Sequence, residues 1–180
     1  MRAVVLEVDE RTIAERHRLG LDKRDEMWKG VLHMVPPASQ RHQDLIRELL
    51  IALEQPARHR GWRVNTENGV FGAANDYRVP DLVVFERSAT SERGIEGAPR
   101  LVVEVRSPGD ESYEKLPWYL ERGAGAVLIV DRDSLQLDLY TTDGKVEPDA
   151  DGALWIEVLG IRISPEGDTL RIDGHLLDLS

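Results

Sequence analysis

The sequence contains no cysteine, which excludes disulfide bonds and thiolate metal sites. It also lacks any apolar run close to the ~20 residues that span a bilayer, so no transmembrane helix is expected. Residues 1–7 are too few, and carry charge too early, to be read as a secretory signal peptide. We therefore expect a cytoplasmic protein that does not associate with membranes.

Several common catalytic motifs are missing as well. No glycine-rich loop ends in Gly-Lys-Ser or Gly-Lys-Thr, and no Gly-x-Ser-x-Gly sequence forms a nucleophile elbow. The glycine pair Gly123 and Gly125 precedes a strand-like segment rather than following one, so it is not a dinucleotide fingerprint. The five histidines have no zinc-ligand spacing. Acidic and basic side chains remain as candidates for chemistry.

The length and composition fit one globular domain. At 180 residues, with 41% hydrophobic and 31% charged residues, the chain can form a substantial core, and we expect a single domain over residues 1–180. The net charge of −10 argues against nonspecific coating of nucleic acid. Residues 131–180 hold 12 acidic and four basic residues, however, so the remainder of the chain is close to neutral.

Apolar periodicity predicts three helices. Asp9 is a suitable N-cap for a helix that ends near Leu19, whose inner face would carry Ile13, Ala14 and His17. Ser39 caps a second helix, which is expected to end near residue 54, before Pro56. A third helix is expected over about 114–122. Because proline is tolerated only in the first turn, Pro117 places Lys115 at the entry of this helix.

Other segments are typical of strands. Asn68-Gly69 predicts a two-residue hairpin between strands 62–67 and 70–71, followed by a loop over 72–79. Turns are expected at Ser164-Pro165 and at Asp173-Gly174. The further strands are expected near 28–35 (a pair), 80–85, 101–106, 126–130, 135–140, 155–158, 161–163 and 170–172. This order predicts an α/β fold, in which helices flank a central mixed β-sheet.

Two acids on these strands are candidate metal ligands. Glu104 lies inside an apolar strand, where an unpaired carboxylate is costly, and Asp81 opens the strand before it. If the two strands are neighbours, both carboxylates can point at one place. With the carbonyl of Val105 they would supply the hard oxygens that Mg²⁺ requires, with Mn²⁺ as a substitute. Lys115 could then orient the attacking water.

Each of these residues also has a structural explanation. Asp81 can be a turn residue, Glu104 a salt-bridged glutamate and Lys115 an exposed helical lysine. His42 and Glu26 are secondary candidates, and each also has a structural explanation. His42 is expected to face inward at the start of the second helix, and Glu26 is expected in a solvated turn.

Three sequence segments resemble the Uma family of restriction-endonuclease-like proteins. They are Pro80-Asp81, Glu104-Val105-x-Ser107-Pro108 and the run from Lys115 to Tyr119. The resemblance extends from about Asp22 to Tyr140. That family is a branch of the PD-(D/E)xK nuclease superfamily, so the resemblance implies a restriction-endonuclease-like core with Asp81 and Glu104 as metal ligands. Where the superfamily has its lysine this chain has Arg106, and the resemblance assigns the lysine's role to Lys115.

Three functions are therefore considered. The first is a Mg²⁺-dependent endonuclease that hydrolyses DNA phosphodiester bonds, with nucleic acid, DNA above all, as partner and a homodimer for double-strand cutting. The second is a catalytically silent protein of nuclease fold that acts as a protein-interaction or regulatory module, which the acidic composition favours. The third is glycoside hydrolysis, which requires two carboxyl groups about 5–9 Å apart.

Overall fold

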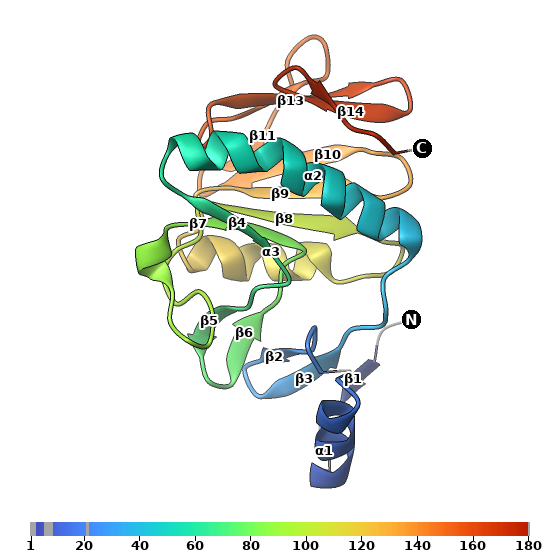
Figure 1. The fold of residues 1–180 in the computed structure, drawn as a ribbon, viewed down its shortest axis with the longest axis vertical. Helices are drawn as coiled ribbons and strands as arrows, with labels where there is room; N and C mark the ends of the chain where they lie inside the picture. The colour runs from blue at the N-terminus through green and yellow to red at the C-terminus, as the bar shows by residue number, and fades with distance from the viewer. Residues whose placement is uncertain (1–2, 6–8, 21, 180) are drawn as a thin grey trace.

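A six-stranded sheet lies at the centre of the protein in a computed structural model, which describes residues 3–5, 9–20 and 22–179 (Figure 1). The strand order is β11-β10-β9-β8-β7-β4. Among these strands β8 and β9 are parallel and the other pairs are antiparallel. The bounds are β4 (Arg63–Thr66), β7 (Leu82–Phe85), β8 (Leu101–Arg106), β9 (Val127–Asp131), β10 (Leu137–Thr141) and β11 (Gly144–Val146).

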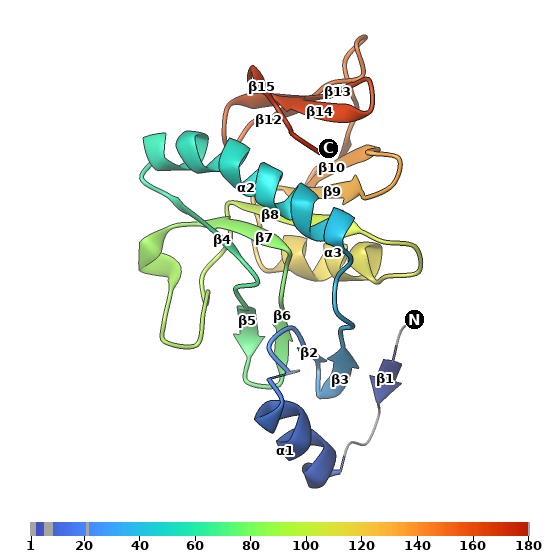
Figure 2. The ribbon, with the colours of Figure 1, turned by 45° about the vertical axis from the view of Figure 1, so that its right-hand side comes forward.

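Helices cover both faces of this sheet. Figures 1 and 2 show α2 (Gln40–His59) on one side and α3 (Ser112–Glu121), which connects β8 to β9, on the other. The apolar stripe of α2, which includes Leu45 and Leu49, packs on one face of the sheet. Tyr119 of α3 is fully buried against the opposite face. The predicted α/β architecture, a central mixed sheet flanked by helices, is confirmed.

A smaller five-stranded sheet carries the N-terminal residues. Its order is β1-β3-β2-β6-β5, and it lies beyond the α3 side of the central sheet (Figure 1). The helix α1 (Glu10–Arg18) projects beside it (Figure 2). The bounds are β1 (Ala3–Val5), β2 (Glu26–Trp28), β3 (Val31–Met34), β5 (Val70–Ala73) and β6 (Asp76–Arg78). This sheet matters because β2 brings Glu26 to the central sheet.

A third sheet packs over α2 and the same face of the central sheet, sharing one apolar core with them. Its strands are β12 (Leu154–Ile156), β13 (Ile161–Glu166), β14 (Thr169–Ile172) and β15 (His175–Leu176), and a short 3-10 helix, η1 (Arg87–Ala89), follows β7. The turn predicted at Ser164-Pro165 is wrong, because Pro165 lies within β13. Its neighbour β12 begins at Leu154, opposite Ile163, and does not extend to Pro165, so the missing N–H of proline breaks no ladder there.

The hairpin predicted at Asn68-Gly69 is also wrong. β4 pairs with β7 in the central sheet, whereas β5 pairs with β6 in the small one, so residues 67–69 connect two different sheets. The expected loop over 72–79 accordingly contains the end of β5 and all of β6. The Asn-Gly signal is local, and long-range pairing with β7 overrides it.

The helix predictions need three corrections. α2 runs through Pro56 to His59, since burial of Ala57 compensates for one lost hydrogen bond. α3 starts at Ser112, two residues earlier than expected, with Pro117 as its sixth residue, and Lys115 lies at the helix entry as expected. The expected inner face of α1 is exposed, with Ile13 48% accessible. No helix in the described part of the chain is both long and apolar enough to cross a membrane.

Candidate active site

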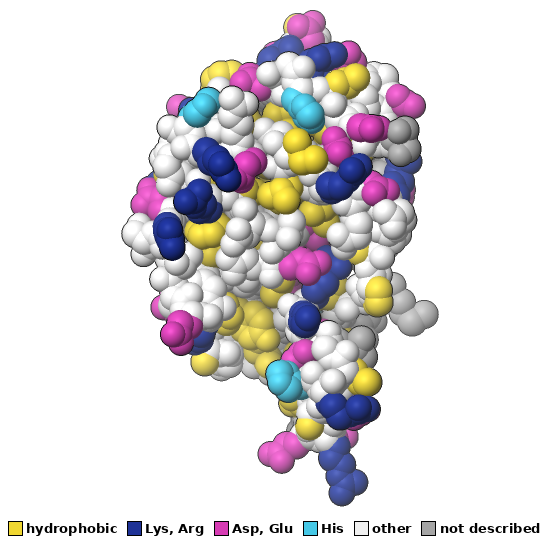
Figure 3. Space-filling model, in the orientation of Figure 1, with side chains coloured by type: hydrophobic (Ala, Val, Ile, Leu, Met, Phe, Trp, Pro, Cys, Tyr) yellow, Lys and Arg dark blue, Asp and Glu magenta, His cyan; other side chains and the backbone are white. Residues whose placement is uncertain are grey.

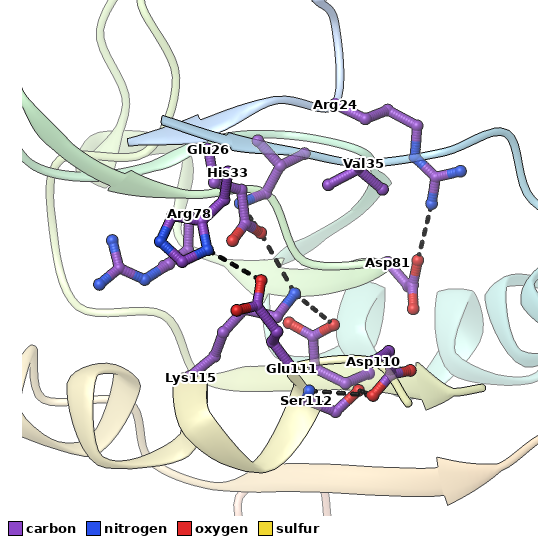
Figure 4. Close-up of polar contacts among 12 residues, drawn as sticks. Arg24, Glu26, His33, Val35, Arg78, Asp81, Asp110, Glu111, Ser112 and Lys115 are labelled. Atoms are coloured by element: carbon purple, nitrogen blue, oxygen red, sulfur yellow. Dashed lines mark hydrogen bonds and ion pairs between the residues drawn. The ribbon is translucent and has the colours of Figure 1, made fainter. Parts of the chain in front are cut away.

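Asp81 lies immediately before β7 and is buried, with 6% of the residue exposed. Its Oδ2 accepts a hydrogen bond from the backbone N–H of Val105 at 2.8 Å. Its Oδ1 lies 3.0 Å from Nε2 of His42 and 3.0 Å from Nη2 of Arg24. Figure 4 shows the Arg24 side chain directed at Asp81. The turn-residue explanation for Asp81 is therefore insufficient, because its carboxylate is held by three separate elements.

The hydrogen-bond ladder between β7 and β8 stops at this point because of a proline. Leu82 pairs with Val103 in antiparallel register, so the residue that would face Val105 is Pro80. Proline has no N–H, and residue 80 therefore gives the carbonyl of Val105 no backbone hydrogen bond. The N–H of Val105 binds the Asp81 side chain instead. The strand ends thus present a carboxylate and a carbonyl side by side.

Glu104 is buried on β8 and is bound by two residues of α3. Its Oε2 lies 2.9 Å from Nζ of Lys115, and its Oε1 accepts a hydrogen bond from the Tyr119 hydroxyl at 2.8 Å. Both donors are on the face that α3 covers, as strand alternation requires. Lys115 is therefore not an exposed helical lysine: its side chain is 11% exposed and paired with Glu104.

Glu26 joins the site from the small sheet. Its Oε1 lies 3.2 Å from Nζ of Lys115 and accepts the N–H of Val79 at 2.9 Å. Its Oε2 accepts the indole N–H of Trp28 at 2.7 Å. Figure 4 shows Lys115 reaching from α3 toward Glu26. The solvated-turn interpretation of Glu26 is wrong, since this residue is 2% exposed and lies in a strand.

A cleft of about 470 Å³ brings all five predicted residues together. One wall is the segment from Met34 to Ser39, and the other is the turn from Ser107 to Glu111 after β8. The predicted residues that line it are Asp81, Glu104, Lys115, Glu26 and His42, with Val105 beside them. Arg106 points elsewhere, to Asp131 at 2.8 Å and to the ring of Tyr113. Lys115, and not Arg106, is therefore the basic side chain that lies with the two acids in the cleft.

The two acids have opposite pKa shifts. Burial by itself would raise the pKa of Asp81, but His42, the charge of Lys115 and the Val105 N–H together hold it below its ordinary value. Burial raises the pKa of Glu104 to about 8. The charge of Lys115 lowers this pKa, whereas the like charges of Asp81 and Glu26 raise it further. Asp81 is thus the ionised partner, and Glu104 gains from any additional positive charge.

Lys115 remains an ammonium group. Burial would lower its pKa, but the carboxylates of Glu104, Glu26 and Asp81 surround it and raise the pKa above its ordinary value. In this state Lys115 can donate hydrogen bonds and stabilise negative charge, but it cannot accept a proton. This limits it to the role of an orienting and charge-stabilising group.

The raised pKa of Glu104 predicts a pH-dependent effect of Glu104→Gln on stability. An unfolded glutamate ionises near pH 4.3, whereas in the folded protein the pKa is about 8. Between these values the folded state holds a proton that the unfolded state has lost, so Glu104 makes the protein less stable as pH rises. Urea unfolding with a chelator present should show the variant gaining stability relative to wild type from about pH 4 to about pH 8.

The matched control for that experiment is Glu114→Gln, which removes one negative charge from the exposed side of the same region. A difference between Glu104→Gln and wild type that stays constant or falls with pH would contradict the raised pKa of Glu104.

Sequence reasoning missed two contributors to the site. Arg24 lies in the connection between α1 and β2, 57 residues from the aspartate that it binds, and no local pattern distinguishes it from other surface arginines. Tyr119 belongs to the segment that carries the family resemblance, but its contact with Glu104 depends on the docking of α3. Only its position, four residues after Lys115 on the same helical face, could have indicated it.

The donor set fits a hard divalent cation. Asp81, Glu104 and the carbonyl of Val105 offer oxygen ligands, as Mg²⁺ prefers. A cation there would oppose the burial and like-charge effects that raise the pKa of Glu104. Within the described ranges no group of three or more histidine, aspartate or glutamate side chains could hold a metal. Backbone carbonyl and water would have to complete the coordination.

Two buried carboxylates from adjacent strand ends, with a lysine on the following helix, characterise a restriction-endonuclease-like α/β protein. A family model described as "Uma2: Putative restriction endonuclease" matches residues 13–166. This match covers most of the chain, and the protein belongs to that family, as the sequence resemblance predicted.

One solved structure confirms the fold. The chain is similar to a crystal structure described as "a putative nuclease belonging to DUF820 from Anabaena variabilis", with a TM-score of 0.64. The two share 18% sequence identity, and the similarity covers 76% of this chain and 83% of that chain. A comparison with curated proteins found no match.

Proposed function

We propose that the protein is a Mg²⁺-dependent endonuclease that hydrolyses DNA phosphodiester bonds, with Mn²⁺ as an effective substitute for Mg²⁺. The observation that carries this proposal is the convergence of Asp81, Glu104 and Lys115 on one cleft, with both carboxylates buried. Burial of two acids beside one ammonium costs free energy. Ionisable groups with strongly shifted pKa values cluster at functional sites, which supports a functional role for this group. Membership of the family supports nucleic acid as the substrate.

The metal would be held by Asp81, Glu104 and the carbonyl of Val105. When bound, Mg²⁺ supplies a Lewis acid that favours ionisation of the attacking water and offsets negative charge on the phosphate. Arg24, His42 and the Val105 N–H fix the carboxylate of Asp81, while the Tyr119 hydroxyl fixes that of Glu104. These contacts orient the ligand oxygens before substrate arrives.

Lys115 has the position and charge to act on the reacting groups. As an ammonium it can donate a hydrogen bond to the attacking water or to a phosphoryl oxygen, on which negative charge increases in the transition state. Glu26 holds the amine from the opposite side to Glu104, at 3.2 Å. This second contact restricts the amine to the cleft, so Glu26 is a positioning residue.

Metal titration tests the proposal directly. Calorimetry should show Mn²⁺ and Mg²⁺ binding to the wild-type protein, and plasmid DNA should be cleaved only with the metal present. Addition of a chelator should stop cleavage, and excess Mg²⁺ should restore it. If neither metal binds, the endonuclease proposal is wrong. Metal binding without cleavage of any DNA would instead favour the catalytically silent alternative.

A further inference from the structure

Three hydrogen-bond donors converge in the cleft that also contains Asp81 and Glu104. Nη1 of Arg132 lies 3.4 Å from Oγ of Ser39 and 3.2 Å from Oγ of Ser107. The three residues come from different elements, because Ser39 caps α2, Ser107 follows β8 and Arg132 follows β9. All three line the same cleft as Asp81 and Glu104.

Both serine hydroxyls keep a donor to spare. Each oxygen accepts a hydrogen bond from Arg132, and that of Ser39 also accepts the N–H of His42. Among the described residues neither hydroxyl proton has an acceptor. A ligand with several acceptor oxygens would therefore meet two O–H groups and a guanidinium. A phosphate group has this character, because its oxygens accept several charge-assisted hydrogen bonds.

Arg132 is also held in place by its neighbour. Its Nε and Nη2 each bind a carboxylate oxygen of Asp133 at 2.9 Å, and the Asp133 side chain is 51% exposed. The guanidinium is therefore oriented before any ligand arrives. Asp133 also competes with an incoming anion, because its carboxylate occupies two of the five donors of the guanidinium.

The position of Arg132 suggests the path of a polymer. Arg132 lines both the cleft and a neighbouring groove of about 260 Å³ beside the start of α2. Arg41, which also lines that groove, donates a hydrogen bond to the backbone carbonyl of Arg132 at 3.0 Å. A chain that leaves the cleft for this groove would pass directly over Arg132.

The face of the molecule in Figure 3 does not offer a broad basic area. On the face in Figure 3, Lys and Arg side chains are interspersed with Asp and Glu, and the described residues drawn there form no continuous basic band. Recognition of a polyanion by this acidic protein therefore depends on small groups of donors. The arrangement of Ser39, Ser107 and Arg132 is such a group.

We propose that Ser39, Ser107 and Arg132 bind a backbone phosphate of the substrate strand, adjacent to the phosphodiester bond that is cut. This inference rests on the proposed function, since the carboxylate cleft defines the place of the scissile bond. It adds a substrate-binding subsite and a direction: the strand runs from the carboxylates, past Arg132, into the groove beside α2.

DNA binding measured in Ca²⁺, a cation with similar oxygen ligands that replaces Mg²⁺, tests the subsite. Fluorescence anisotropy with a short fluorescein-labelled DNA should show that Arg132→Gln weakens binding about tenfold or more and lowers the salt slope by about one. Ser39→Ala and Ser107→Ala should each weaken binding several-fold. Asp133→Asn should strengthen binding, because it removes the competing carboxylate.

Arg162→Gln is the matched control. Arg162 is likewise paired with an aspartate, Asp149, at 2.8 Å, but it lies in the C-terminal sheet. It should leave affinity unchanged. If Arg132→Gln binds like wild type, if both arginine variants lose affinity equally, or if wild type does not bind DNA, the subsite is refuted. Should Arg132→Gln fail to fold, Arg132→Lys and Ser107→Ala carry the same test.

The two proposals can fail separately. Binding that depends on Arg132, without any metal-dependent cleavage, would refute the endonuclease and leave the subsite standing. Metal-dependent cleavage with an unchanged KM in Arg132→Gln would refute the subsite and leave the endonuclease standing. A role for Arg132 that is only structural predicts a lower melting temperature in Arg132→Gln and no gain of affinity in Asp133→Asn.

Discussion

Replacement of Asp81 by asparagine is expected to abolish Mg²⁺-dependent cleavage of DNA. Asparagine keeps the size of the side chain and one acceptor oxygen but removes the charge that would bind the proposed cation. Loss of the metal removes several kcal/mol of transition-state stabilisation. At 1.36 kcal/mol per factor of ten, this corresponds to a fall of about a thousandfold or more in cleavage rate. Rates of plasmid nicking at saturating Mg²⁺ measure the effect.

Asp138→Asn is the control for burial and charge. Asp138 is also 6% exposed in the central sheet, and it is paired with Lys145 and Tyr113 rather than with the cleft. Its replacement should lower stability and leave the cleavage rate of the folded protein close to wild type. Equal activity of wild type and Asp81→Asn would remove Asp81 from the mechanism, and with it the proposed metal site.

Replacement of Lys115 by methionine is expected to have the largest effect on stability. Methionine retains the length and the apolar stem but leaves Glu104 and Glu26 buried without their shared cation. Breaking a buried ion pair in this way typically costs about 3–5 kcal/mol. Urea unfolding above pH 8, where Glu104 is ionised in the folded protein, should therefore show a large loss, together with loss of cleavage activity.

A second substitution separates charge from packing. In a Lys115→Met background, Glu104→Gln removes one of the uncompensated carboxylates, so the double variant should be more stable than Lys115→Met alone. Lys145→Met is the control, because its pair with Asp138 has a similar length of 2.7 Å but a 43% exposed lysine. Such an exposed pair contributes about 0–1 kcal/mol. Equal losses in the two lysine variants would contradict the structural burial of Lys115.

The paired acids were predictable from the sequence because they depend on local rules. Strand alternation and the apolar run around Glu104 placed this residue on a buried strand, and Pro80-Asp81 marked the start of its neighbour. Because β7 and β8 are adjacent in the sheet, the two patterns converge as expected. Lys115 taken alone could also be an exposed helical lysine, and the resemblance to the Uma family singled it out.

The remaining contributors depend on contacts that no local pattern encodes. Glu26 reaches Lys115 across 89 residues, and only the pairing of β2 with β6 in a separate sheet brings it there. The Asn-Gly pair at 68–69 carries a strong hairpin signal, yet β4 gains more by joining the central sheet. Propensity rules describe strands well but do not describe which strands become neighbours.

The proline at position 80 has a consequence for how such a site can be built. Any other amino acid there would carry an amide hydrogen facing Val105, and one more rung of antiparallel pairing would then engage the carbonyl oxygen that we propose as a metal ligand. Because proline has no N–H, the carbonyl oxygen of Val105 receives no hydrogen bond from residue 80. The proposed coordination sphere thus depends partly on a hydrogen bond that the backbone is unable to make.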